Sequence, residues 1–137
     1  MDKDVLLNKT AIIERCIKRI NEEYNNDPSS LNNITKQDSI ILNIQRACEA
    51  SIDLAMHVIA EKGLGIPQYS RDAFDMLASE HIIEKDLANI LKAMVGFRNI
   101  AVHNYQELKL SVVKQIIEHN LKDLLHFSRV LIQAYLN

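Results

Sequence analysis

The chain is poor in the residues that make turns. Its 137 residues include 3 glycines and 2 prolines. A β-sandwich or barrel needs many turns, which these residues usually make. The shortage therefore argues against an all-β fold and favours a few long helices. Aromatic residues are also scarce, at 5%, and tryptophan is absent, so the core must be aliphatic.

Other shortages narrow the class of protein. A net charge of −2 excludes a strongly basic, histone-like binder, although it leaves a local basic site open. The two cysteines, Cys16 and Cys48, lack C-x-x-C spacing, so they indicate apolar packing in a reducing compartment. No apolar run approaches the ~18 residues of a membrane span, and the start, MDKDVLLNK, has no secretory h-region. We therefore expect a cytoplasmic protein that does not enter a membrane.

Apolar residues recur every three or four positions, which is the period of an amphipathic helix. They predict long helices over 5–24, 36–62, 85–102 and 111–137, and a short helix over 71–80. The last two long helices are joined by a short link, which makes antiparallel neighbours. We predict an all-α fold, an up-and-down four-helix bundle with an extra short helix, in a single domain over residues 1–137.

Boundary signals support these helices. Thr35 with Asp38 resembles a capping box before the second long helix. Gly63 and Pro67 would end that helix, because glycine permits a positive φ and proline blocks continuation. Ser70 is a suitable N-cap for the short helix.

One segment departs from the amphipathic pattern: residues 96–105, GFRNIAVHNY. At about 100° per residue, Arg98 falls within the stripe that the fourth helix would bury. A guanidinium is almost never buried without a partner. Arg98 therefore either reaches past the end of the bundle or lies in a second, half-buried interface.

His103 lies about 140° around the ideal helix from Arg98. The two side chains can act together only if the helix distorts near its end or a second copy of the chain supplies one of them. A two-fold dimer achieves the latter. Gly96 would suit such a close helix approach. Glycine inside a helix costs roughly 1 kcal/mol relative to alanine, so we expect a contact that offsets this cost.

These residue types suit cleavage of a phosphodiester without a metal. Arginine is a fixed cation that fits phosphate, and histidine exchanges a proton near neutral pH. In RNA the 2′-hydroxyl would attack its own phosphate, leaving a 2′,3′-cyclic phosphate. The competing interpretation is that an arginine, histidine and tyrosine near a helix end are caps, dipole partners or surface residues.

The segment from Arg98 to Tyr105, RNIAVHNY, resembles the R-x4-6-H motif of HEPN domains, and its form R-x4-H-x-Y resembles the HepT toxins of HepT–MntA toxin–antitoxin pairs. The resemblance covers nearly the whole chain. It includes I-x-R-C-I-K-R-I from Ile13, D-S-I-I-L-N-I-Q-R from Asp38 and L-G-I-P-Q-x-S-R-D-x-F from Leu64.

The resemblance implies a homodimeric HEPN bundle with a composite cleft that acts as a metal-independent endoribonuclease toxin and needs no cofactor. Arg98 would stabilise the phosphate, His103 would be the general acid or base, and Asn99 would support the site. Tyr105 would be adenylylated by a cognate MntA-like nucleotidyltransferase, the antitoxin, in a complex that could be a larger hetero-oligomer. The added AMP would block RNA and could occupy Arg98.

Several alternatives stay open. Asp38 or Glu49 could orient Arg98 or a partner arginine, although a solvated face or a pairing of Glu49 and Asp53 with Arg46 is simpler. A set of basic residues could line an RNA groove with Arg98, although solvated positions without aromatic interleaving are simpler: Lys18, Arg19, Arg46 and Arg71. The alternative function is a non-catalytic helical partner or scaffold of a nucleotidyltransferase.

Overall fold

The structure, a computed structural model, describes residues 1–136, and these contain no strand. The long helices are α1 (Lys3–Tyr24), α2 (Ile34–Lys62) and α4 (Lys85–His103), with the short α3 (Asp72–Ser79) before α4. The last helix runs from Leu110 in three parts: α5 (Leu110–Gln115), a π-helical turn η3 (Ile116–Asn120) and α6 (Leu121–Tyr135). Two 3-10 turns, η1 (Pro28–Asn32) and η2 (Tyr105–Glu107), occupy connections.

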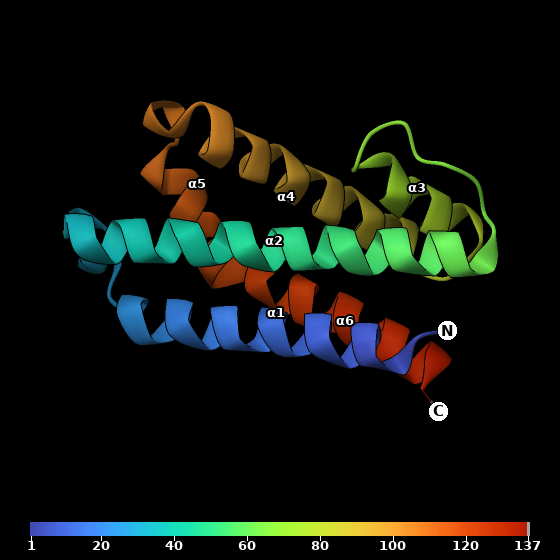
Figure 1. Cartoon of the computed structure of the whole chain (residues 1–137). Coiled ribbons are helices and arrows are strands. Elements are labelled where there is room, and N and C mark those ends of the chain that lie inside the picture. The colour runs from blue at the N-terminus through green and yellow to red at the C-terminus, as the bar shows by residue number, and fades with distance from the viewer. Residues whose placement is uncertain (137) are drawn as a thin grey trace.

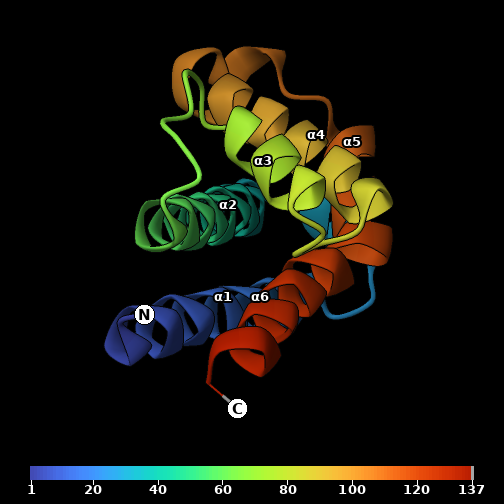
Figure 2. The same cartoon turned by 90° about the vertical axis from the view of Figure 1, so that its right-hand side faces the viewer.

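The helices form an antiparallel bundle (Figure 1). α1 and α2 lie side by side and run in opposite directions, and α4 crosses the other flank of α2. Seen end-on in Figure 2, α1 and α6 lie on one side of α2, and α3 and α4 on the other. The all-α bundle with one extra short helix is thus confirmed. No helix of residues 1–136 is long and apolar enough to span a bilayer.

The amphipathic stripes predicted from the sequence meet in one aliphatic core. The two aromatic rings at its centre, Phe74 of α3 and Phe127 of α6, lie edge to face with centroids 5.5 Å apart, an arrangement that adds to the stability from burial alone. Cys16 and Cys48 are buried and free, as expected. Burial raises the pKa of the Cys48 thiol to about 12, so this thiol packs as a small apolar group.

Two predicted caps are wrong. α2 is capped by Asn33, whose side chain accepts the Lys36 N–H at 3.1 Å, which leaves the Asp38 carboxylate available for another contact. At α3 the cap position is Arg71 rather than Ser70, and it makes no side-chain cap bond. The Asp72 carboxylate instead accepts the Tyr69 N–H at 3.0 Å and closes that turn.

The predicted stop after α2 is confirmed, with Gly63 in the left-handed region at φ 63°. The last helix begins one residue before the predicted 111, and the sequence did not reveal its π turn. Glu118 within that turn accepts a hydrogen bond from the hydroxyl of Tyr24, the last residue of α1. This contact ties the end of α1 to the middle of the last helix.

Candidate active site

Arg98 is held by a carboxylate of the neighbouring helix. Its Nε and Nη2 donate to Oε2 of Glu49 on α2 at 3.1 and 2.9 Å. Its Nη1 donates to Oδ1 of Asn99 at 3.2 Å. With 29% of its side chain exposed, Arg98 lies half-buried between α4 and α2, and one guanidinium edge is fixed before any ligand arrives. Of the two carboxylates considered from the sequence, Glu49 is the partner.

His103 is the last residue of α4 and is exposed. The helix keeps its regular bonding across the motif, since the Asn104 N–H still donates to the Ile100 carbonyl at 2.8 Å. The distortion considered above as one way to bring Arg98 and His103 together is therefore absent. On such a regular helix the two side chains leave α4 about 140° apart, so they do not lie on one face of it.

Tyr105 opens η2 just beyond α4 and is 42% exposed. Its hydroxyl donates to Oδ1 of Asp38 on α2 at 2.5 Å. Burial, together with the hydrogen bond and negative charge of Asp38, raises the pKa of Tyr105 to about 12. The phenol is therefore neutral at physiological pH, and its proton already points at a carboxylate.

The pairing with Arg46 that the sequence offered for Glu49 and Asp53 is absent: Glu49 binds Arg98, and Asp53 pairs with Lys9 at 2.9 Å. Asp53 is exposed, in line with the other alternative, a solvated face. A Cβ atom at Gly96 would meet no heavy atom of the chain within 4 Å. No contact within the chain requires this glycine, and its close approach to a second copy stays a prediction.

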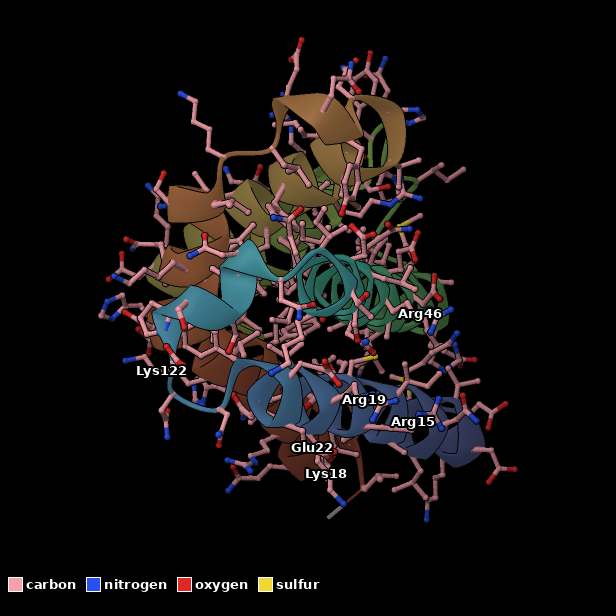
Figure 3. All side chains as sticks on the ribbon, turned by 90° about the vertical axis from the view of Figure 1, so that its left-hand side faces the viewer. Arg15, Lys18, Arg19, Glu22, Arg46 and Lys122 are labelled. Carbon is pink, nitrogen blue, oxygen red and sulfur yellow. The ribbon has the colours of Figure 1, made fainter. Side chains whose placement is uncertain are left out.

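Of the four basic residues considered for a groove, two adjoin the site. Arg46 lines a groove between α1 and α2 together with Glu49, and Arg71 lines a cavity together with Asn99. Arg19 instead approaches Glu22 at 3.9 Å. Lys18 lines a separate pocket facing α6. Sequence reasoning missed Arg15, which lies opposite Arg46 across the groove (Figure 3).

Histidine, cysteine and acidic residues are dispersed over the described chain. Nowhere in residues 1–136 do three or more of them gather closely enough to hold a metal ion. The groups at hand for chemistry are thus a fixed guanidinium, an exposed imidazole and a hydrogen-bonded phenol.

Known proteins resemble this chain over most of its length. The family model described as "Ribonuclease HepT-like" matches residues 13–131. The chain belongs to the HepT-like ribonuclease family. The mRNA nuclease HepT of Shewanella oneidensis is 49% identical over 128 residues, which cover 93% of this HepT-like chain and 96% of that protein.

Solved structures extend the likeness to three dimensions. A tri-AMPylated HEPN toxin of Shewanella oneidensis in complex with an MNT antitoxin is 48% identical, with a TM-score of 0.90 over 97% of this HepT-like chain and 99% of that one. A toxin–antitoxin structure with AMP-PNP is 47% identical, with a TM-score of 0.92 over 96% and 99% of the two chains. The HEPN-type bundle is therefore the fold of this HepT-like chain.

Proposed function

We propose that this chain is the toxin of a toxin–antitoxin pair, a metal-independent endoribonuclease whose site combines Arg98 and His103 from two copies of the chain. The close relative is named as an mRNA nuclease. The observation that carries the composite site is the undistorted end of α4. Because Arg98 turns inward to Glu49 while His103 emerges on another side, a second copy is needed to complete the pair.

The surface around the motif supports a homodimer. Four apolar side chains near the end of α4 and the start of the last helix are exposed by 37–43%: Ile100, Val102, Leu110 and Val112. Exposed apolar side chains on the two elements that flank the motif suit a contact with another chain. In a two-fold dimer the same surface meets itself, so both copies of the motif lie near the axis.

The chemistry follows from the groups present. The 2′-hydroxyl of RNA attacks the adjacent phosphorus, and His103 moves the proton between the attacking and leaving oxygens. Arg98 stabilises the charge that builds up on the phosphate oxygens. Asn99 supports Arg98 by accepting a hydrogen bond from the guanidinium edge that Glu49 leaves open. The products are a 2′,3′-cyclic phosphate and a free 5′-hydroxyl.

We assign Tyr105 as the residue that a cognate MntA-like nucleotidyltransferase adenylylates, in a complex that includes the homodimer. The related toxin is tri-AMPylated and bound to an MNT antitoxin. Tyr105 lies two residues beyond His103, and its exposed ring can accept such a group. Each AMP brings negative charge and bulk beside the cleft, which repels RNA. We also propose that residues 1–137 form a single HEPN-like domain. Because RNA cleavage and adenylylation need RNA and nucleotides, we place this domain in the cytoplasm.

Mixing two inactive variants tests the composite site. Arg98→Ala and His103→Ala should each abolish RNA cleavage while circular dichroism shows an intact fold. After both are unfolded and refolded together, half of the dimers contain one chain of each kind, and one of their two sites is complete. Cleavage should then return to about a quarter of the wild-type rate.

Failure to recover activity would assign both residues to a site within one chain. If neither variant reduces cleavage, or the wild-type protein cleaves no RNA, the non-catalytic scaffold is the better account. Adenylylation is tested separately by the intact mass of the protein made with its nucleotidyltransferase. AMP-sized increments should appear in the wild type and be absent from Tyr105→Phe.

A further inference from the structure

A groove of about 310 Å³ between α1 and α2 brings two unpaired arginines together. Arg15 and Arg46 line it from opposite helices (Figure 3). Both positive charges lower the pKa of Cys16 against the burial that raises it, so both guanidiniums lie near the same point. Neither makes an ion pair with a carboxylate of residues 1–136. Their donors are therefore free to bind an anion.

This groove adjoins the proposed cleavage site through Glu49. Glu49 lines it and also holds Arg98 at 2.9 Å. On the other side of Arg98, Asn99 lines a cavity of about 400 Å³ together with Arg71. Arg71 is exposed and likewise makes no ion pair with a carboxylate of the described chain. Arg98 is thus linked to Arg15 and Arg46 through Glu49, and to Arg71 through Asn99.

We propose that Arg15, Arg46 and Arg71 bind the phosphates that flank the one cleaved at Arg98, so that a single RNA strand crosses the helices. The inference rests on the proposed ribonuclease function. Arginine suits this role because its fork of donors fits phosphate oxygens. A protein partner is the weaker alternative, because the unpaired arginines lie around Arg98, the residue that acts on a phosphate.

The contribution of these arginines to RNA binding is measured apart from cleavage by using the inactive His103→Ala protein. The added changes are Arg15→Gln with Arg46→Gln, and separately Arg71→Gln. The matched control is Arg129→Gln, an exposed arginine that lines a pocket between α1 and α6. The probe is a short single-stranded RNA with fluorescence anisotropy as readout. Affinity is measured over a range of salt concentrations.

We expect the double change to reduce the slope of log affinity against log salt by about 1.4 and Arg71→Gln by about 0.7, since each phosphate contact contributes about 0.7. The control should keep the parent slope. Equal slopes in all variants would refute phosphate binding by Arg15, Arg46 and Arg71. A loss of antitoxin binding with RNA binding intact would refute it too, because that result would assign the surface to a protein partner. If RNA binds normally but the wild-type protein never cleaves, the proposed function fails instead.

A second inference rests on a separate contact, the hydrogen bond from Tyr105 to Asp38. A neutral phenol is a weak nucleophile, so its proton must leave when its oxygen attacks. Asp38 is exposed and already accepts that hydrogen bond at 2.5 Å. A base within hydrogen-bond reach of the proton is what general-base catalysis requires.

We infer that Asp38 is the catalytic base for the first AMP addition, given that Tyr105 is the modified residue as proposed above. The Tyr105 oxygen attacks the α-phosphorus of a nucleoside triphosphate, and a new O–P bond forms. The bond from that phosphorus to the pyrophosphate oxygen breaks, and pyrophosphate leaves. The phenolic proton passes to Oδ1 of Asp38.

The test compares Asp38→Asn with the wild type as substrates of the nucleotidyltransferase, following the first AMP increment by mass. At pH 7 the variant should be slower by 10²-fold or more, the usual contribution of a general base, roughly 10²–10⁴. Its rate relative to wild type should rise about tenfold per pH unit toward pH 10, where a free phenol ionises.

A variant that reacts at the wild-type rate, or is slower by the same factor at every pH, overturns the catalytic role. The second outcome would mean that Asp38 only orders the loop. A wild-type protein that takes no AMP refutes the assignment of Tyr105 itself and is recognised before the variant is compared.

Discussion

Gly96 and Gly63 allow a paired test of how backbone conformation decides the effect of an added methyl group. At both positions a Cβ atom would meet nothing within 4 Å, so alanine has room at each. They differ in conformation: Gly96 lies inside α4, whereas Gly63 ends α2 with φ at 63°. An L-residue is comfortable in the first conformation and strained in the second.

The expected changes have opposite signs. Gly96→Ala should raise the free energy of unfolding by about 0.8–1.0 kcal/mol, the difference in helix propensity. For a chain of this length that corresponds to a rise in Tm of about 3–4 °C. Gly63→Ala should lower the free energy of unfolding by about 1–2 kcal/mol, the cost of the left-handed conformation for an L-residue.

Urea and thermal unfolding followed by circular dichroism measure both changes, at several protein concentrations so that self-association is separated from folding. A lower Tm for Gly96→Ala would refute the argument that alanine has room there and favours the helix. A higher Tm for Gly63→Ala would refute the argument from its left-handed conformation. If Gly96→Ala is less stable only at concentrations where the protein self-associates, then a second copy packs against Gly96.

Three further predictions follow from single contacts. Glu49→Gln should reduce cleavage about tenfold, because Arg98 exchanges its ion pair with a carboxylate for a weaker bond to a neutral amide oxygen, while Tm changes little for this partly exposed pair. Tyr24 has a pKa raised to about 12 by burial and then by Glu118. Its stabilisation is therefore complete below about pH 10 and is lost as pH rises toward 12, and Tyr24→Phe should lack that loss in urea titrations. Phe127→Ala should lower the free energy of unfolding by about 3–5 kcal/mol, because it empties a site with 0% exposure; a loss below 1 kcal/mol would contradict the packing.

Local periodicity was enough to predict the helices. The apolar residues that recur every three or four positions in the first helix are buried: Leu6, Ile13, Cys16, Ile17, Ile20 and Tyr24. Gly63 ends the second helix, as predicted. The caps were less predictable, because several polar residues near a helix start compete for the same N–H groups. Asn33 is the cap where Thr35 was expected.

The sequence indicated candidate residues for the site but not the contacts that they make. Motif resemblance pointed to Arg98 and His103, but the bond from Arg98 to Glu49 joins positions 49 residues apart. The bond between Tyr105 and Asp38 joins positions 67 apart. Such contacts depend on how α2 and α4 cross, which periodicity does not determine. Arg15 was overlooked for the same reason, since its importance comes from lying opposite Arg46.

Glu49 also gives the unliganded protein a form of substrate discrimination. Its carboxylate binds Nε and Nη2 of Arg98 and offsets much of the arginine's charge, so an anion has only the remaining edge and a weakened attraction to gain from. A mononucleotide offers a single phosphate to that edge. A polynucleotide that is already bound at neighbouring arginines presents its next phosphate at a high effective concentration. The arrangement would spare the abundant free nucleotides of a cell and select for chain length before any base is read.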